Sequence, residues 1–337
     1  MSKRILTVTL VLILVSMTLW GEKKAELPEL KQPKTLAVDD TQLYVTESAS
    51  ILIYSLKDYK LVRKFGKEGQ GPQEFQTLPH VPVTVDVSTD LLIAASIRKI
   101  SYFTKQGEYI DEVRGVNLAL NLRLCTGDRF MAWSQAKTEG VTYNTITLFD
   151  AKLNKLKELY RVKDSYQGPG RGYHVLHKVF TYQTYDGKIL LPGKDDASID
   201  ILDGKLNKLL TIRLDQEPIK VDAAFKERLI HHFKTSPEIK NVLPMLKPLI
   251  FPDYFPVIAD FFVDDGIIYI MTWKRENGEN EFFTYDMKGT FKKRLMIPIR
   301  YETDLDAYPT MVKNGKLYQL VDNEKTETWE LHVSGIR

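Results

Sequence analysis

The sequence predicts an all-β protein, a six-bladed β-propeller built from four-stranded antiparallel blades. Three observations support this prediction. A unit of four short apolar strands recurs along the chain, polar turns separate the strands, and several of those turns are Asp-Gly or Asn-Gly. The composition, 43% hydrophobic and 27% charged, is sufficient for a large core. A single all-β domain can reach the length of this chain, 337 residues.

Residues 1–21 predict an export signal. Lys3 and Arg4 precede an uncharged run over residues 5–20, and charged residues 22–24 end it. As a helix this run would span about 24 Å, which is less than the roughly 30 Å of the bilayer core. A signal peptide is therefore favoured, and an uncleaved anchor is the alternative. We expect a periplasmic or extracellular monomer, with membrane contact only if the N-terminal segment stays attached.

Six repeated units follow the signal segment and form one domain over residues 22–337. They cover residues 36–66, 83–115, 122–162, 180–214, 256–298 and 308–337. Dipeptides that favour the positive φ angles of tight hairpins join their strands. These are Asp186-Gly187, Asp203-Gly204, Asp265-Gly266, Lys288-Gly289 and Asn314-Gly315. Such hairpins connect neighbouring antiparallel strands, as the blades of a propeller require.

The sixth unit supplies only three strands. An incomplete blade would leave an exposed sheet edge, which favours aggregation. The one extended segment left over follows the signal peptide. We therefore expect residues 22–31 to pair as the outer strand of the last blade, beside residues 326–333.

The stretch "GKEGQGPQEFQTLP", residues 66–79, connects the first and second units. In a propeller the outer strand of one blade is followed by the innermost strand of the next, so the chain must cross the face of the disc. The glycines of this stretch permit tight backbone and its prolines stiffen it. Phe75 is expected to fill the gap between the two blades.

This crossing resembles the NHL-repeat pattern, and more closely the exported six-bladed propeller proteins of bacteria with their "GxGPGEF" crossing. The matching positions are Gly69, Gly71, Pro72, Glu74, Phe75, Pro79, Val83, Val85 and Asp86. Gln73 replaces the usual glycine, and residues 96–103 match the third strand of the repeat. The resemblance implies the fold. It implies little about function, because this fold hosts binding modules, scaffolds and a few enzymes.

Two crossings carry additional residues. Residues 165–179 contain Gly168, Pro169 and Gly170 followed by four polar or aromatic side chains, Arg171, Tyr173, His174 and His177. Residues 215–255 predict a helical cap between the fourth and fifth units. Asp222 is expected to cap a helix over residues 221–233, and Ser236 and Pro237 indicate a second helix start.

A propeller usually binds its ligand on the face formed by the crossings and by the loops between second and third strands. The residues expected there are Arg98, Trp133, Arg171, Tyr173, His174, His232, Tyr254, Trp273 and Arg275. Trp273 beside Arg275 is the composition of a binding surface. We therefore expect an exported binding module that recognises a protein or a small molecule rather than an enzyme.

A metal-dependent lactonase- or lyase-like enzyme is the alternative. Its candidate ligands around the central channel are His80, His174, His177 and Asp260. The sequence has no nucleophile elbow, zinc-protease motif or phosphate-binding loop. The net charge of +3 gives no reason to expect nucleic acid as a partner. Cys125, the one cysteine, is expected to be a buried, inert thiol.

Overall fold

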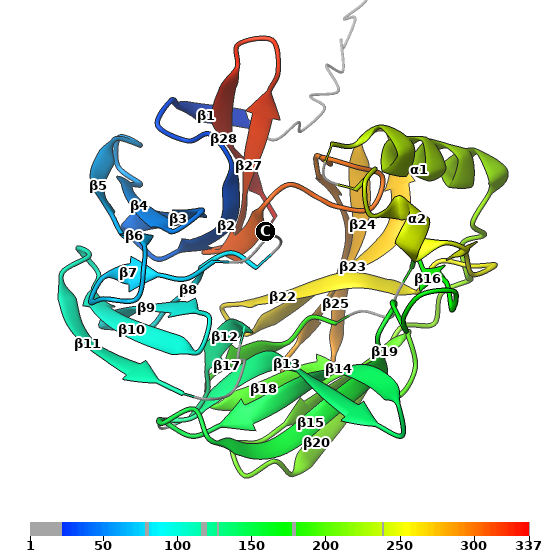
Figure 1. Cartoon of the computed structure of the whole chain (residues 1–337), viewed down its shortest axis with the longest axis horizontal. Helices are drawn as coiled ribbons and strands as arrows, with labels where there is room; N and C mark the ends of the chain where they lie inside the picture. Colours follow the sequence, from blue (N-terminus) through cyan, green and yellow to red (C-terminus); the bar gives the residue numbers. More distant parts are fainter. Residues whose placement is uncertain are drawn as a thin grey trace, which may run out of the picture.

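A computed structural model describes residues 22–77, 81–115, 120–126, 128–176, 180–237 and 239–336. Six four-stranded antiparallel sheets lie around a central axis (Figure 1). A small helical insertion lies between the fourth and fifth sheets. The predicted all-β, six-bladed propeller is therefore confirmed. The expected signal segment, residues 1–21, lies outside the described residues.

Each blade runs from an inner strand near the axis to an outer strand at the rim. Blade 1 consists of β2 (Pro33–Val38), β3 (Gln42–Glu47), β4 (Ser50–Ser55) and β5 (Leu61–Phe65). Blade 2 consists of β8 (Thr84–Val87), β9 (Leu91–Ser96), β10 (Lys99–Thr104) and β11 (Tyr109–Arg114). Blade 3 consists of β12 (Leu120–Leu124), β13 (Phe130–Thr138), β14 (Val141–Phe149) and β15 (Lys155–Lys163). Blade 4 consists of β17 (Gln183–Tyr185), β18 (Lys188–Pro192), β19 (Ser198–Leu202) and β20 (Lys208–Arg213). Blade 5 consists of β22 (Ile258–Asp264), β23 (Ile267–Glu276), β24 (Glu279–Asp286) and β25 (Phe291–Pro298). Blade 6 consists of β26 (Thr310–Lys313), β27 (Lys316–Asn323), β28 (Thr328–Gly335) and β1 (Glu22–Leu27).

The inner strands contact one another in a closed cycle, β2, β8, β12, β17, β22, β26 and back to β2. Apolar side chains between neighbouring blades form the core, as in the cluster that joins Ile53 of blade 1 to Leu92 of blade 2. No helix in the described part of the chain is long and apolar enough to cross a membrane.

The N-terminal segment closes the ring. β1 pairs antiparallel with β28, with Glu22 opposite Val333 and Leu27 opposite Trp329. The side chains of Leu27 and Leu30 are buried beside Trp329, and the Trp329 indole N–H donates to the Lys31 carbonyl over 2.9 Å. The predicted pairing of residues 22–31 with residues 326–333 is confirmed, except that the strand ends at Leu27 and residues 28–32 lead to β2.

Three of the five predicted Gly turns are tight hairpins with positive φ at both central residues. These are Asp186-Gly187, Asp265-Gly266 and Asn314-Gly315. The turns that contain Gly204 and Gly289 are longer than predicted. In them the side chains of Asp203 and Asp286 accept the backbone N–H groups two and four residues later, and the φ of Gly289 is +81°.

The crossing between blades 1 and 2 is held by internal contacts. Phe75 is fully buried in the core between these blades, next to Phe103, as predicted. Gly66 has φ +87°, and a Cβ there would lie 2.7 Å from both the Ala49 carbonyl oxygen and a Phe75 ring carbon. The ammonium group of buried Lys99 donates to the Gly71 carbonyl over 2.9 Å. These contacts show that the loop serves the architecture.

The insertion packs on the face that carries the crossings. Helix α1 (Ala223–Thr235) begins with the predicted cap, because the Phe225 N–H donates to the Asp222 carboxylate over 2.7 Å. The second helix was predicted to begin at Ser236 and Pro237, but α2 (Leu243–Leu246) is a single turn. Ser236 instead caps the end of α1, since its N–H donates to the His232 carbonyl.

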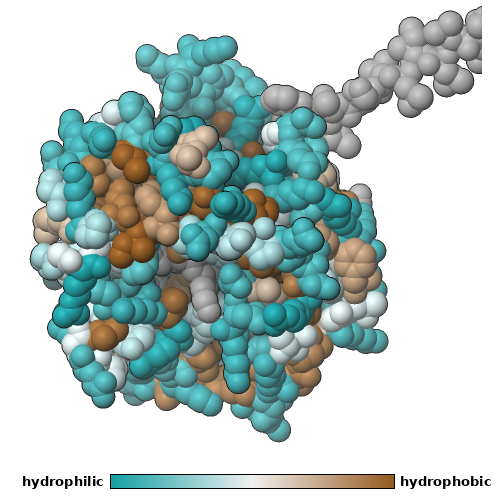
Figure 2. All heavy atoms as spheres, turned by 90° about the vertical axis from the view of Figure 1, so that its right-hand side faces the viewer, coloured by the Kyte–Doolittle hydropathy of each residue, from teal (hydrophilic) through white to brown (hydrophobic). Residues whose placement is uncertain are grey.

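Two pairs of short strands stabilise the crossings, one pair joining two crossings and the other lying within the crossing between blades 1 and 2. β16 (Tyr173–His174) pairs in parallel with β21 (Leu249–Ile250), and β6 (Lys67–Glu68) pairs with β7 (Glu74–Phe75). The side of the molecule that includes α1 and α2 shows apolar groups among hydrophilic ones (Figure 2). Among the described residues, four exposed large apolar side chains belong to the insertion: Ile219, Val242, Met245 and Tyr254.

Candidate functional site: a cavity between blades 5 and 6

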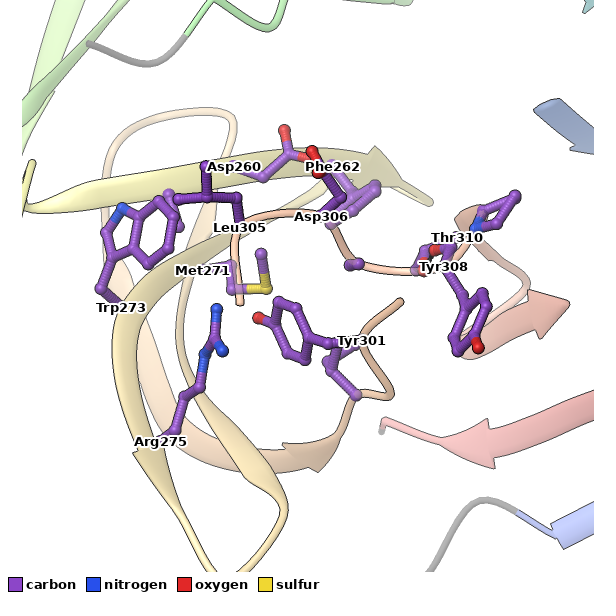
Figure 3. A pocket seen from close by; sticks show the side chains of 14 residues that line it. Asp260, Phe262, Met271, Trp273, Arg275, Tyr301, Leu305, Asp306, Tyr308 and Thr310 are labelled. Atoms are coloured by element: carbon purple, nitrogen blue, oxygen red, sulfur yellow. Dashed lines mark hydrogen bonds between the residues drawn. The ribbon is translucent and has the colours of Figure 1, made fainter. Parts of the chain in front are cut away.

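A cavity of about 270 Å³ opens on the crossing face, between blades 5 and 6. Its walls come from β22, β23 and the crossing that joins β25 to β26. The side chains drawn in Figure 3 include polar groups, Asp260, Arg275, Tyr301 and Asp306, beside apolar ones. Below it, Phe262 and Met271 belong to the apolar core between the two blades. The cavity therefore lies at one end of the apolar core between blades 5 and 6.

Irregular strand pairing directs the side chains of blade 5 into this cavity. The register of β22 with β23 shifts between Ile258 and Asp260, which leaves Ala259 as the extra residue of a bulge. The register of β23 with β24 shifts between Met271 and Arg275. Bulges bend a strand and redirect its side chains, and they are frequent beside functional sites.

The Arg275 side chain lies between two aromatic rings (Figure 3). Its guanidinium carbon is 3.5 Å from the centre of the Tyr301 ring and 5.5 Å from that of Trp273. Its Nη2 donates to the Asp304 carbonyl over 3.2 Å. The buried Nε has no hydrogen-bond partner in the described part of the protein. Two aromatic rings thus contact a guanidinium group whose Nη2 is paired and whose Nε has no partner among the described residues.

Trp273 separates this cavity from a neighbouring one. Its ring stacks on Phe255 with 4.9 Å between ring centres and 26° between planes. Its buried Nε1 also lacks a partner among the described residues. The neighbouring cavity, about 490 Å³, lies beside α1, and both Trp273 and Arg275 contribute to its wall. There Arg228 is paired with Asp304 over 3.0 Å.

Asp260 is a partly buried acid in the wall of the cavity. Its Oδ1 accepts the Thr181 hydroxyl over 2.5 Å and the Phe261 N–H over 2.8 Å. Burial raises the pKa of this carboxyl, although both hydrogen bonds and the charge of Arg123 act in the opposite direction. A carboxyl group with a raised pKa in a cavity can exchange a proton or bind a hydrogen-bond donor.

Tyr301 belongs to the crossing between blades 5 and 6. An antiparallel bridge to Ala307 folds this crossing into a narrow loop. Gln319 of β27 fixes its start, because its amide oxygen accepts the Arg300 N–H over 2.9 Å. Burial raises the pKa of Tyr301, so its phenol stays protonated. The loop therefore presents one neutral ring, the Tyr301 ring, against the guanidinium group.

The structure brings three of the sequence-predicted residues to this cavity, Trp273, Arg275 and the metal candidate Asp260. The others lie apart from the cavity wall. Arg98 and Arg171 are exposed at turns, and the Trp133 backbone binds the Tyr182 hydroxyl. Tyr173 packs near Phe233 under α1, and His174 next to it is exposed.

The remaining predicted residues are on or beside the insertion or outside the described part. His232 lies on α1, and Tyr254 is 52% exposed. His80 and His177 lie outside the described residues. Within the described residues, no three His, Cys, Asp or Glu side chains form a group that could hold a metal ion.

The sequence analysis missed the contribution of the crossing between blades 5 and 6. Tyr301, Leu305 and Asp306 line the cavity, yet this short crossing carries no glycine motif. The one signal was its position, directly after the fifth unit and opposite the Trp273 and Arg275 hairpin.

The opposite end of the channel has its own opening, about 620 Å³, lined by all six blades. Its charges are largely paired within the protein: Lys105 with Asp39 over 3.0 Å, and Arg123 with Asp86 over 3.3 Å. Cys125 lies there, and burial raises the pKa of its thiol to about 12. This thiol is therefore unreactive near neutral pH, as expected.

The fold and this cavity define the chain as a β-propeller. No model of a known protein family matches the sequence, and no curated protein matches it. The chain is similar to a solved protein of Bacteroides fragilis NCTC 9343 described as exported, with 14% identity, a TM-score of 0.55, and coverage of 95% of this chain and 94% of that one. It is also similar to a member of the DUF4221 family from Bacteroides vulgatus, with 11% identity, a TM-score of 0.47, and coverage of 93% and 94%.

A luciferin-regenerating enzyme aligns over 94% of this chain and 98% of its own, at 11% identity and a TM-score of 0.46. Because these sequence identities are low, the similarity concerns the fold alone.

Proposed function

We propose that the chain is an exported β-propeller that binds a ligand on its crossing face, with the cavity between blades 5 and 6 as the binding site. A volume of about 270 Å³ suits a small molecule or the end group of a larger one. Export is supported by the charged start and uncharged run of residues 1–21.

The observation that carries this proposal is a pair of buried donors. Trp273 Nε1 and Arg275 Nε both lack a hydrogen-bond partner in the described part of the chain, and both residues line the same cavity. Leaving a buried donor unpaired costs about 1–3 kcal/mol. Proteins seldom retain that cost at two neighbouring groups unless a ligand, an ion or an ordered water supplies the acceptors, and both groups here line one cavity.

An enzymatic function is the second candidate, and Asp260 is the observation that favours it. A partly buried carboxyl with a raised pKa in a cavity is suited to general acid or base catalysis. The metal-dependent form of this hypothesis is tested by metal analysis of protein purified without chelator. Absence of a stoichiometric divalent metal would remove it.

Ligand binding can be tested by thermal shift with a broad set of small metabolites. Ala259→Phe adds a ring inside the cavity without removing a polar group. Thr89→Phe adds the same ring at the opposite opening and serves as the control. A ligand that stabilises the wild-type protein and Thr89→Phe but not Ala259→Phe supports the proposal. A ligand that stabilises all three equally binds elsewhere and contradicts it.

A further inference from the structure

We infer that the cavity between blades 5 and 6 recognises the carboxylate of a small monocarboxylic acid, and that Arg275 is the residue that binds it. This inference rests on the function proposed above and adds the chemical class of the ligand.

The first step is the missing counter-ion. Arg275 forms no ion pair in the described ranges of the chain, although Asp260 and Asp306 line the same cavity. The nearby Asp304 carboxylate is taken by Arg228. By contrast, Arg294 of the same blade pairs with Glu281 over 2.5 Å. A partly buried cation with no anion of its own favours an anionic ligand.

The second step is the orientation of the guanidinium group. Tyr301 and Trp273 contact it as a cation–π pair, at 3.5 Å and 5.5 Å between guanidinium carbon and ring centre. The two rings hold the group in position, and the donors at its edges include Nε, which has no described partner. A carboxylate meets those edges in the same plane through two parallel hydrogen bonds. The ring contacts therefore hold Arg275 ready for a planar anion.

The third step is the charge of the rest of the cavity. Arg275 is the one cationic side chain of the cavity wall as described, and two acids, Asp260 and Asp306, share that wall. A dianionic phosphate would gain one cation and face two carboxyl groups, whereas a monocarboxylate is balanced by Arg275 alone. Burial also favours the neutral form of Asp260, which reduces the repulsion.

The fourth step is the body of the ligand. Phe262, Met271 and Leu305 provide an apolar wall. The Oδ1 atom of Asp260 is occupied by Thr181 and Phe261, while no described residue donates to its Oδ2 atom. An acid with a small apolar group fits this wall, and a hydroxyl or amino group on it would find an acceptor in Asp260. The volume of about 270 Å³ is sufficient for a small acid of this kind.

The test compares acids with their neutral amides on the protein comprising residues 22–337. The probes are phenylacetate and 3-phenyllactate against phenylacetamide and 3-phenyllactamide. Binding is measured by calorimetry and by the ¹⁵N–¹H signal of the Arg275 Nε–H, assigned through its loss in Arg275→Gln. Arg228→Gln is the matched control, because Arg228 is on the same face but is already paired.

We expect at least one acid to bind about 10- to 100-fold more tightly than its amide, the gain typical of hydrogen bonds to a charged group. Arg275→Gln should abolish that difference, Arg228→Gln should keep it, and the acid should shift the Nε–H signal. If acid and amide bind equally and Ala259→Phe blocks both, the cavity binds ligands but the carboxylate inference is wrong. If acids still bind Ala259→Phe, the proposed site itself is wrong. If no probe shifts the Nε–H signal at millimolar concentration, the inference is overturned.

Discussion

The guanidinium carbon of Arg275 lies 3.5 Å from the centre of the Tyr301 ring, and no described carboxylate pairs with this guanidinium group. Arg275 lies near the end of β23 in blade 5, and Tyr301 lies in the crossing from blade 5 to blade 6. Their contact joins the two walls of the cavity. It also positions a charge for which no described residue supplies a counter-ion.

The fold should therefore tolerate loss of this charge. Arg275→Met keeps the apolar stem and removes a partly buried, unpaired cation, so we expect the free energy of unfolding to stay within about 1 kcal/mol of wild type. The matched variant is Arg294→Met, which leaves the Glu281 side chain, 3% exposed, without its cation. Because Arg294 itself is half exposed, a loss of roughly 1–3 kcal/mol is expected. Urea unfolding measures both, and a larger loss for Arg275→Met than for Arg294→Met would show that Arg275 is structural.

Asp260 should make stability depend on pH. Its folded-state pKa is raised by burial above the unfolded value of about 3.9. Below that value the carboxyl is protonated in both states, and the wild-type protein loses stability as pH rises through the folded-state pKa. Asp260→Asn has no proton to lose.

Melting temperatures of Asp260→Asn and the wild type from pH 4 to pH 8 test this sign. The melting temperatures of the two proteins should approach each other near pH 4, and the variant should become the more stable protein toward pH 8. A difference that does not change with pH would show that Asp260 ionises freely.

The crossing between blades 1 and 2 should tolerate no side chain at Gly66. Gly66 and Gly140 both have positive φ, +87° and +77°, so alanine is strained by a similar amount at either position, about 1 kcal/mol. A Cβ at Gly140 has nothing within 4 Å, whereas one at Gly66 meets the Ala49 carbonyl and the Phe75 ring. Gly66→Ala should therefore be clearly less stable than Gly140→Ala in chemical denaturation. Equal losses would mean that backbone strain alone explains this glycine.

Ring closure should contribute strongly to stability. Leu27, the last residue of β1, is fully buried in an apolar cluster with Trp329, and Leu27→Ala should cost about 2–5 kcal/mol. Deletion of residues 22–31 should cost several kcal/mol, because it also exposes the edge of β28. Removal of residues 236–245 from the insertion should cost less. A deletion of residues 22–31 that melts like the mature protein would contradict the closure.

Sequence patterns predicted the propeller because its signals are local and repeated. Strand alternation, Asp-Gly and Asn-Gly hairpins and the count of strands per unit are all visible without tertiary contacts. The closing strand followed from the same count. The prediction of a second helix starting at Ser236 was wrong. Ser236 and Pro237 are typical of a helix start, but in the structure Ser236 caps the C-terminal end of the preceding helix α1.

The site was predicted only in part. Trp273 and Arg275 were found because their residue types suggest binding, but their pairing with Tyr301 depends on a crossing of ordinary composition. Lys99 looks like a surface cation in the sequence, yet it is buried and holds the Gly71 carbonyl. Contacts between different blades decide such roles, and no local pattern encodes them.

The central claim is tested most directly by a crystal structure of residues 22–337 determined from crystals soaked with 3-phenyllactate. We expect the acid to lie in the cavity between blades 5 and 6, with its carboxylate in the plane of the Arg275 guanidinium group and its ring against Phe262 and Met271. An acid ordered beneath α1 or in the opposite channel opening, with only water beside Arg275, would contradict it.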